Sequence, residues 1–212
     1  RPPGVVSTKA RFLSYENIEF LPSAPLPIHP YLLGAMLGDG TLKESLGFTN
    51  ADPGVLNRVR ALLQVEGYHL SPHKSDPYFY HVYQNEVRQR TAKGQFPAGP
   101  LQGKLSALGL RVSGGDKFVP PAYLVASAEN RRQLLAGLID TDGSLGEFVN
   151  KSHALCEAVV WLVRSLGGRA TLKETRKRAQ TGPYRTYYRV RWGLHVRLPL
   201  SRADKQRPYG KG

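Results

Sequence analysis

The segment "LLAGLIDTDGSL" (Leu134–Leu145) is an apolar, helix-like run that ends in two aspartates, Asp140 and Asp142, followed by Gly143. A glycine directly after the last helical residue is typical of a helix C-terminus. Acidic side chains are disfavoured there, because the negative pole of the helix dipole lies at that end. The pattern therefore indicates that these acids have a role other than stabilising the helix.

The same pattern occurs a second time, nearer the N-terminus. The segment "LLGAMLGDGTL" (Leu32–Leu42) aligns with "LAGLIDTDGSL" (Leu135–Leu145) at an offset of 103 residues, so that Asp39 is equivalent to Asp142. Each motif is followed by "FTN" or "FVN", by a helix-like run that ends in glycine, and by a tyrosine-containing strand pattern. The chain is therefore predicted to duplicate a unit of helix, two strands, helix, two strands and trailing helix about a pseudo-twofold axis.

Small residues line one face of each predicted motif helix. Gly34 and Gly38 are four positions apart and share a face, as do Gly137 and Thr141 in the second copy. Small residues at this spacing allow two helix backbones to approach closely. We therefore expect the two motif helices to pack against each other. The residues expected to end them as C-cap glycines are Gly40 and Gly143.

Packing of these helices would place Asp39 and Asp142 side by side at their C-termini. Two carboxylates there repel each other and the helix dipoles, and a divalent cation would offset this repulsion. Mg²⁺ takes oxygen ligands, and the free carbonyls of Gly38 and Thr141 are further candidates. A single "GDG" is more simply a solvated helix end, but two copies in register favour a metal site.

Both motifs resemble the LAGLIDADG motif of homing endonucleases, and the second departs from it only at Thr141. The resemblance extends from about Pro30 onward, and "DKFVPP" (Asp116–Pro121) is similar to a K-x-x-P element of intein-encoded members. It implies an α+β fold, a pseudo-twofold pair of αββαββα units with a DNA-binding antiparallel β-saddle. The expected parts are a Pro-rich N-terminal arm or linker (1–29), a first half (30–120) and a second half with a basic tail (121–212).

The resemblance also implies which residues act. The eighth place of the family motif carries the metal-binding acid, which is Asp39 in the first copy and Asp142 in the second. The sixth place is Asp140 in the second copy but Leu37 in the first, so Asp140 is interpreted as structural, pairing locally near the helix end.

One basic residue near the metals is implied in each half. Lys117 matches the lysine of the K-x-x-P element, and Lys205, in "LPLSRADKQRP" (Leu198–Pro208), is its expected partner. Both lysines are expected to stabilise developing negative charge or to orient water. Asn50, Gln95 and Gln102 are polar residues able to hold water, and the sequence does not select among them.

The implied activity is that of a site-specific endonuclease making a staggered double-strand break in a long, asymmetric DNA target. Mg²⁺ is the expected cofactor, with Mn²⁺ or Ca²⁺ as substitutes for binding, and a monomer is expected. One alternative is a DNA-binding regulator that does not cut, although both motif acids are present. The other is an RNA maturase that assists intron splicing.

Charge points to a polyanionic partner. The chain has 30 Lys and Arg against 16 Asp and Glu, a net charge of +14 with a pI near 10.1. Residues 1–120 hold 13 basic and 9 acidic residues, whereas residues 121–212 hold 17 and 7. A merely basic surface is the simpler alternative, but double-stranded DNA is the favoured partner, bound more strongly by the second half.

The strand pattern "YRTYYRVRW" (Tyr184–Trp192) alternates basic and apolar residues, which predicts one face on DNA and the other on helices. Arginines on such a face bind guanine edges, whereas a solvated hairpin would contact phosphates only. The predicted DNA-binding residues of the second half are Arg185, Tyr187, Arg189, Arg191, Lys173, Arg176, Lys177 and Arg178. Those of the less charged first half are His69, Lys74, His81 and Tyr83.

The remaining features concern the cellular context. The single cysteine, Cys156, excludes an internal disulfide and falls on an apolar helix face, where core packing is expected. No apolar run is long enough to span a membrane, so an intracellular protein, nucleoid-associated or cytoplasmic, is expected without a membrane partner. The chain does not begin with Cys or Ser or end in His-Asn, so self-splicing is not expected.

Overall fold

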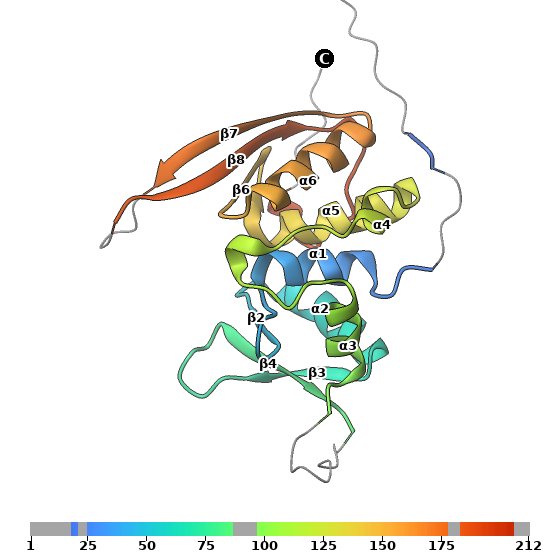
Figure 1. Cartoon of the computed structure of the whole chain (residues 1–212), viewed down its shortest axis with the longest axis vertical. Helices are drawn as coiled ribbons and strands as arrows, with labels where there is room; N and C mark the ends of the chain where they lie inside the picture. The colour runs from blue at the N-terminus through green and yellow to red at the C-terminus, as the bar shows by residue number, and fades with distance from the viewer. Residues whose placement is uncertain (1–17, 21–24, 87–96, 178–182, 206–212) are drawn as a thin grey trace, which may run out of the picture.

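The computed structural model describes residues 18–20, 25–86, 97–177 and 183–205, and within these the chain forms two copies of one unit (Figure 1). The first copy consists of α1 (Pro30–Asp39), β1 (Gly40–Thr41), β2 (Gly47–Thr49), α2 (Pro53–Val65), β3 (Tyr68–Pro72), β4 (Phe79–Gln84) and α3 (Pro100–Ala107). A 3₁₀ turn, η1 (Gly114–Asp116), and a short helix, α4 (Pro121–Leu124), lead into the second copy. The second copy consists of α5 (Ala128–Asp142), β5 (Gly143–Ser144), β6 (Glu147–Asn150), α6 (His153–Ser165), β7 (Arg169–Lys177), β8 (Arg185–Gly193) and η2 (Ala203–Lys205).

Each copy builds one antiparallel four-stranded sheet with the same strand order. The order is β1-β2-β4-β3 in the first and β5-β6-β8-β7 in the second. Phe48 pairs with Tyr80 in the first sheet, and Phe148 pairs with Val190 at the equivalent place in the second. The α+β architecture predicted from the repeat is confirmed. The copies differ at their ends, because η2 is a 3₁₀ turn where the first copy has helix α3.

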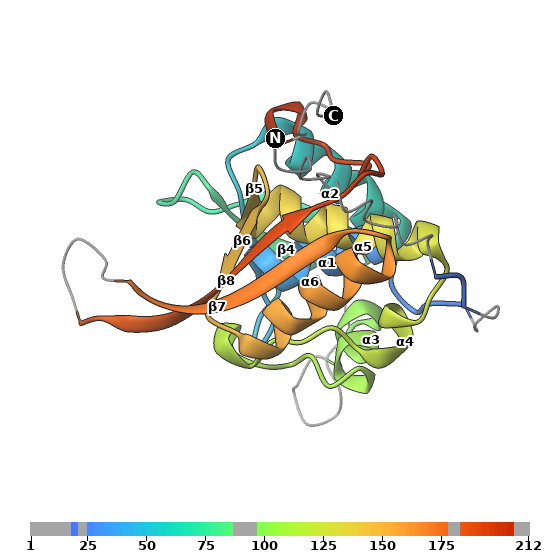
Figure 2. The ribbon, with the colours of Figure 1, turned by 90° about the horizontal axis from the view of Figure 1, so that it is seen from above.

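The centre of the molecule is the contact between α1 and α5, which lie side by side (Figures 1 and 2). A Cβ atom on Gly34 would lie 2.2 Å from the carbonyl oxygen of Leu134. A Cβ on Gly137 would lie 2.3 Å from the carbonyl oxygen of Tyr31. The two backbones therefore touch where the glycines leave room, which confirms the expectation drawn from the spacing of small residues.

Helices α2 and α6 cover the inner faces of the two sheets. Their apolar positions recur with helical spacing, and Val59 and Val159 are fully buried at equivalent places. Each helix has an N-cap side chain: Asp52 accepts a hydrogen bond from the Val55 amide at 3.0 Å, and Ser152 accepts one from Leu155 at 3.1 Å. These caps fix the turn between the sheet and the helix, next to the ends of α1 and α5. Cys156 is also fully buried in this core, as expected.

The glycines that end the motif helices do so in an extended conformation, with φ of −81° at Gly40 and −95° at Gly143. Left-handed geometry is therefore not the reason for glycine at these C-caps. A Cβ on Gly40 would lie 2.3 Å from the carbonyl oxygen of Met36, and one on Gly143 would lie 2.7 Å from Cα of Ile139. The chain turns from helix directly into strand, and only glycine fits against the last helical turn.

Part of the N-terminal segment is attached to the second copy. The Ile18 amide donates to the carbonyl oxygen of Ser165 at 3.1 Å, and the Arg131 guanidinium bonds the Ile18 carbonyl. Arg131 is fully buried and also donates to the Ser165 carbonyl at 2.9 Å. Among the described residues, no helix is both long and apolar enough to cross a membrane.

Candidate active site and DNA-binding surface

The C-terminal ends of α1 and α5 adjoin, and each ends in its motif aspartate. Asp39 is the last residue of α1, and Asp142 is the last of α5. A Cβ on Gly38 would lie 2.0 Å from Oγ1 of Thr141 and 3.6 Å from the backbone nitrogen of Asp142. The charge of Asp142 also raises the pKa of Asp39. The structure thus brings together two acids that are about a hundred residues apart in the sequence.

Each aspartate is held by an asparagine from its own copy. Nδ2 of Asn50 donates to Oδ2 of Asp39 at 2.6 Å, and Nδ2 of Asn150 donates to Oδ2 of Asp142 at 2.6 Å. The Oδ1 atoms of both asparagines accept a backbone amide two residues on, at 2.8 Å in each case. Both amide groups are therefore oriented by the turn that starts α2 or α6. The sequence offered Asn50 as one of three polar residues able to hold water and did not single out Asn150. The repeated "FTN" and "FVN" after the two motifs could have identified both asparagines.

Burial raises the pKa values of both acids. It is the main reason why the pKa of Asp39 rises to about 6, and the Asn50 hydrogen bond opposes the rise. The pKa of Asp142 is raised for the same reason, while Asn150 and the two nearby lysines lower it. A site with two such acids favours a cation that would stabilise their charged forms.

Lys117 and Lys205 take equivalent places at the two helix ends. Nζ of Lys117 donates to the carbonyls of Gly40 at 2.7 Å and Leu37 at 2.8 Å. Nζ of Lys205 donates to the carbonyls of Asp140 at 2.7 Å and Ile139 at 2.9 Å. Each ammonium group therefore satisfies the last carbonyls of a motif helix and offsets the negative pole of its dipole.

Both lysines are buried, which lowers their pKa values. The pKa of Lys117 falls to about 8 because of desolvation, and the charges of Asp142 and Asp39 oppose the fall. Desolvation likewise lowers the pKa of Lys205. The two acids and two lysines thus form one cluster of buried, mutually compensating charges at the junction of the copies.

The segments that carry the lysines are each fixed by the opposite copy. The Ser152 hydroxyl, at the N-cap of α6, donates to the carbonyl oxygen of Lys117. Arg202, three residues before Lys205, lies with its Nε 3.5 Å from Oδ2 of Asp52, the N-cap of α2. The position of each lysine therefore depends on contacts between the two copies.

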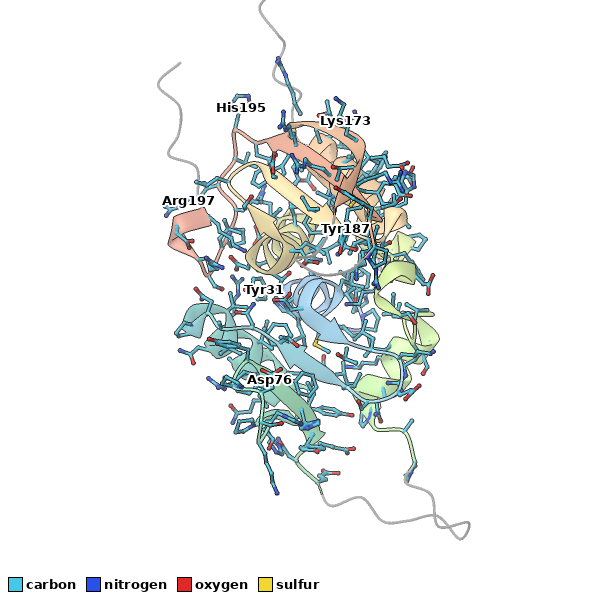
Figure 3. All side chains as sticks on the ribbon, turned by 90° about the vertical axis from the view of Figure 1, so that its left-hand side faces the viewer. Tyr31, Asp76, Lys173, Tyr187, His195 and Arg197 are labelled. Carbon is cyan, nitrogen blue, oxygen red and sulfur yellow. The ribbon has the colours of Figure 1, made fainter. Side chains whose placement is uncertain are left out.

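Asp140 has a structural environment, but its partners are distant in the sequence. It is fully buried, and its Oδ2 accepts hydrogen bonds from the Tyr31 hydroxyl and the Ser201 amide, both at 2.7 Å. The Arg202 amide donates to its Oδ1 at 3.2 Å. The expectation of local pairing near the helix end is wrong, because the partners come from α1 and the C-terminal segment. Tyr31 lies between the two copies (Figure 3).

The donor atoms at the helix ends fit a divalent cation that prefers oxygen. Within the described residues, no group of three or more His, Cys, Asp and Glu side chains is placed to hold a metal. The two carboxylates are supplemented by the carbonyls of Gly38 and Thr141, each 3.2 Å from a lysine Nζ. Two carboxylates with a few carbonyls suit a hard divalent cation that takes its remaining ligands from water.

The outer face of the second sheet is basic. Arg191 is exposed, whereas Val190 and Trp192 beside it are buried against the helices, as the alternation predicted. Arg189 pairs with Lys173, and Arg191 pairs with Thr171, so these side chains share the outer face. Strands β7 and β8 extend beyond the helices as a long hairpin, and Lys173 and Tyr187 are seen on it in Figure 3.

Two further residues predicted to contact DNA, Arg176 and Lys177, lie on β7. Arg176 is exposed but pairs with Thr186, so it lies on the face opposite Arg189 and Arg191. Lys177 pairs with Arg185 at the end of β7. Arg178 lies outside the described residues.

Two of the polar residues considered for holding water near the metals are not placed at the site. Gln95 lies outside the described residues. Gln102 caps α3, with its Oε1 accepting from the Gly99 amide at 2.9 Å.

The outer face of the first sheet carries rings in place of arginines. Tyr83 pairs with His69, and His81 pairs with Ser71, which puts all of these on one face. The rings of His81 and Tyr83 are stacked with centroids 5.4 Å apart, and that of Phe79 lies edge-on to His81 at 5.0 Å. A ladder of rings thus runs across the sheet, made by His69, Tyr83, His81, Phe79 and His73. The predicted Lys74 follows the ladder as an exposed residue.

The fold matches that of known LAGLIDADG homing endonucleases, although no family model matches the sequence. A structure of mesophilic variants of the homing endonuclease I-DmoI aligns with a TM-score of 0.50 and 17% identity, covering 79% of this chain and 89% of that one. A complex of I-DmoI with DNA and Ca aligns with a TM-score of 0.49 and 17% identity, covering 79% and 83%. At this identity the likeness establishes the fold of I-DmoI for this chain and not its activity.

One curated protein is similar in sequence. The replicative DNA helicase DnaB of Mycobacterium intracellulare is 31% identical over 176 residues, which cover 81% of this chain. The chain spans 23% of the length of that helicase.

Proposed function

We propose that this chain is a site-specific homing endonuclease that makes a metal-dependent, staggered double-strand break in a long, asymmetric DNA target. One observation carries the proposal: two aspartates at adjoining helix ends, each held by an asparagine, beside two buried lysines. The fold shared with I-DmoI supports it, since I-DmoI is a homing endonuclease.

The carboxylates of Asp39 and Asp142 would hold the metal, with the carbonyls of Gly38 and Thr141 as further oxygen ligands. Mg²⁺ is the proposed ion, with Mn²⁺ or Ca²⁺ able to replace it in binding. When bound, such an ion supplies Lewis-acid stabilisation of charge on the phosphate that is cut. Asn50 and Asn150 orient the carboxylates and favour their ionised forms, because their hydrogen bonds lower both pKa values.

The lysines supply positive charge next to the reacting phosphates. The pKa of Lys117, about 8, leaves its ammonium mostly protonated at neutral pH. Its positive charge would therefore stabilise negative charge that develops on a phosphate, while its hydrogens bind the carbonyls at the end of α1. Lys205 would act in the same way at the other helix end. Because one set of acid, asparagine and lysine belongs to each copy, each copy is proposed to serve one strand.

The two outer sheet faces are proposed to bind duplex DNA on either side of this site. The arginines of β8 suit guanine edges and phosphates. The ladder of rings on β3 and β4 suits contacts with DNA that depend less on charge than those of the β8 arginines. Two different faces recognise two different half-sites, so one copy of the chain would bind a long, asymmetric target as a monomer.

The helicase relative suggests how the nuclease is encoded. A segment similar to this chain makes up 23% of that polypeptide, which is named as a helicase. We therefore propose an endonuclease of the intein-encoded type, carried inside a host protein. The "DKFVPP" element before α4 agrees with this type. A protein of this kind acts inside the cell, where its DNA is.

A selection experiment tests the proposal. Circular duplexes with a randomised insert are incubated with the protein and Mg²⁺, and linear products are amplified over several rounds and sequenced. We expect linear molecules that share one insert sequence, no linear product with chelator, and none with Asp39→Asn or Asp142→Asn. Asp76→Asn, which changes an exposed acid, is the matched control and should cut normally.

Two results would contradict the proposal. No linear product, together with recovery of one duplex sequence from the same library by its binding to the protein, would indicate a non-cutting regulator. Binding to structured RNA with no selection of duplex DNA would indicate a maturase.

A further inference from the structure

Glu147 is an acid on the basic outer face of the second sheet, at the start of β6. It pairs with Arg191 across β6 and β8, on the face that also carries Arg189 and Lys173. Among the described strand residues of that face, Glu147 is the only acid. Its charge repels phosphates, so on electrostatic grounds it weakens binding of this face to any DNA.

The carboxylate of Glu147 contacts two arginines through one oxygen. Oε1 of Glu147 lies 3.2 Å from Nε of Arg191 and 3.7 Å from Nη1 of Arg189. The side chain of Arg191 is 71% exposed, whereas those of Arg189 and Glu147 are 31% and 34% exposed. Ion pairs at this exposure contribute little to folding stability. Their effect is to restrict where the two guanidinium groups point.

The contact between Glu147 and Arg191 does not use the arginine donors that bind guanine. Because this contact engages Nε of Arg191, it leaves the two Nη groups of that arginine as donors for another partner. An arginine fork donates to O6 and N7 of guanine in the major groove, which is the most common specific contact to a base. An arginine oriented before binding loses less conformational freedom on binding than a free one.

The equivalent position in the first sheet shows the opposite arrangement. Gly47 takes the place of Glu147, and Phe79 and His81 take the places of Arg189 and Arg191. A Cβ on Gly47 would lie 2.6 Å from the ring of Phe79. Where the face has no arginine, the position is occupied by glycine, which leaves room for the Phe79 ring. The acid therefore occurs only in the copy that has arginines to orient.

We infer that Glu147 is a specificity-determining residue, which orients Arg191 toward a guanine of a duplex DNA target. The inference rests on the proposed binding of this sheet to DNA. It assigns guanine-containing base pairs to the half-site under β6 and β8. It also makes an unusual prediction, that removing the acid strengthens binding to random DNA and weakens discrimination.

The test compares Glu147→Ala with Glu174→Ala. Glu174 lies on β7 but faces the opposite side of the sheet, where it pairs with Tyr188. It makes no ion pair with another described residue, so it controls for loss of one negative charge on the same hairpin. Binding is measured in Ca²⁺ by fluorescence anisotropy, on a duplex selected by the unaltered protein and on a random-sequence duplex of equal length. Circular dichroism confirms that both variants are folded.

Both variants should bind the random duplex about two- to five-fold more tightly, since each loses one repulsive charge. Only Glu147→Ala should lower the ratio of specific to random affinity by a further factor of about 10. Guanine pairs in the selected half-site should also become replaceable at little cost. Equal ratios in the two variants, or a selected half-site without guanine, would overturn the inference while leaving the endonuclease proposal intact. Failure of the unaltered protein to select any duplex would remove the endonuclease proposal, and this inference with it.

Discussion

The two copies agree closely at the helix ends and differ across the outer faces of their sheets. Asp39 and Asp142 are each bound by an asparagine at 2.6 Å, and a lysine closes each helix end. The sheet faces share strand order and register, but one carries arginines and the other a ladder of rings. Under the proposed function, a reaction that occurs once on each strand would constrain the two helix ends alike, and an asymmetric DNA target would allow the two sheet faces to differ.

The largest effect is expected from substitutions that change one of the two equivalent helix ends. Asp39→Asn and Asp142→Asn should each reduce linearisation of a target plasmid by a factor of about 10³ or more, since loss of one main electrostatic group costs about that much. Each variant should still bind the target within about tenfold of the unaltered protein. Cleavage is followed on agarose gels and binding by anisotropy in Ca²⁺. Normal linearisation by either variant would show that its aspartate does not contribute to the reaction.

The next prediction concerns the helix contact on which this equivalence depends. Gly34→Val would force side-chain atoms into the Leu134 carbonyl and should lower the free energy of unfolding by about 3 kcal/mol or more. Gly103→Ala is the matched control, because a Cβ there meets no atom within 4 Å. It lies inside α3 and should stabilise the protein by up to about 1 kcal/mol. Urea denaturation measures both, and equal stability of the two variants would contradict the close helix contact.

The raised pKa of Asp39 gives the third prediction, for the metal-free protein. Folded Asp39 keeps its proton up to about pH 6, whereas the unfolded chain releases it near the ordinary value of 3.8. The stability that this shift contributes is therefore present below about pH 4 and is lost as the pH rises through 6, by at most about 3 kcal/mol. Asp39→Asn lacks this loss, so its stability relative to the unaltered protein should rise between pH 4 and 6. Urea denaturation in chelator tests this, and a constant difference would contradict the shift.

The smallest expected effect sharpens the contrast between the two sheet faces. Replacing Arg185 and Arg191 by alanine should reduce the slope of log affinity against log salt by about 1 to 2. Replacing His69 and Tyr83 should change that slope by less than about 0.5, because neither replacement removes a permanently charged group. Binding of a selected duplex is measured from low to moderate salt. Equal changes in slope would mean that both faces bind phosphates in the same way.

The paired helices were predictable because their cause is local. The spacing of Gly34, Gly38, Gly137 and Thr141 defines a small-residue face on each helix, and the repeat aligns the two acids. The extended C-caps at Gly40 and Gly143 were not predictable, because the close approach that requires glycine depends on how the strand leaves the helix.

Contacts between strands and between the two copies could not be predicted from the sequence, because they depend on how segments distant in the chain are placed in the fold. The ladder of rings, the pairing of Glu147 with two arginines, and the placement of Arg176 on the opposite face follow from strand register. The partners of Asp140 come from α1 and the C-terminal segment. Asn150 is the exception, since the repeated Phe-x-Asn after each motif marked its place.

Binding of Mn²⁺, followed by electron paramagnetic resonance, tests most directly whether Asp39 and Asp142 form one metal site. The unaltered protein is compared with Asp39→Asn, Asp142→Asn, the double variant and the control Asp76→Asn. Each motif substitution alone should weaken Mn²⁺ binding about tenfold or more, with little further loss in the double variant, while the control binds normally. Unchanged Mn²⁺ affinity in either single variant would contradict a site shared by the two helix ends.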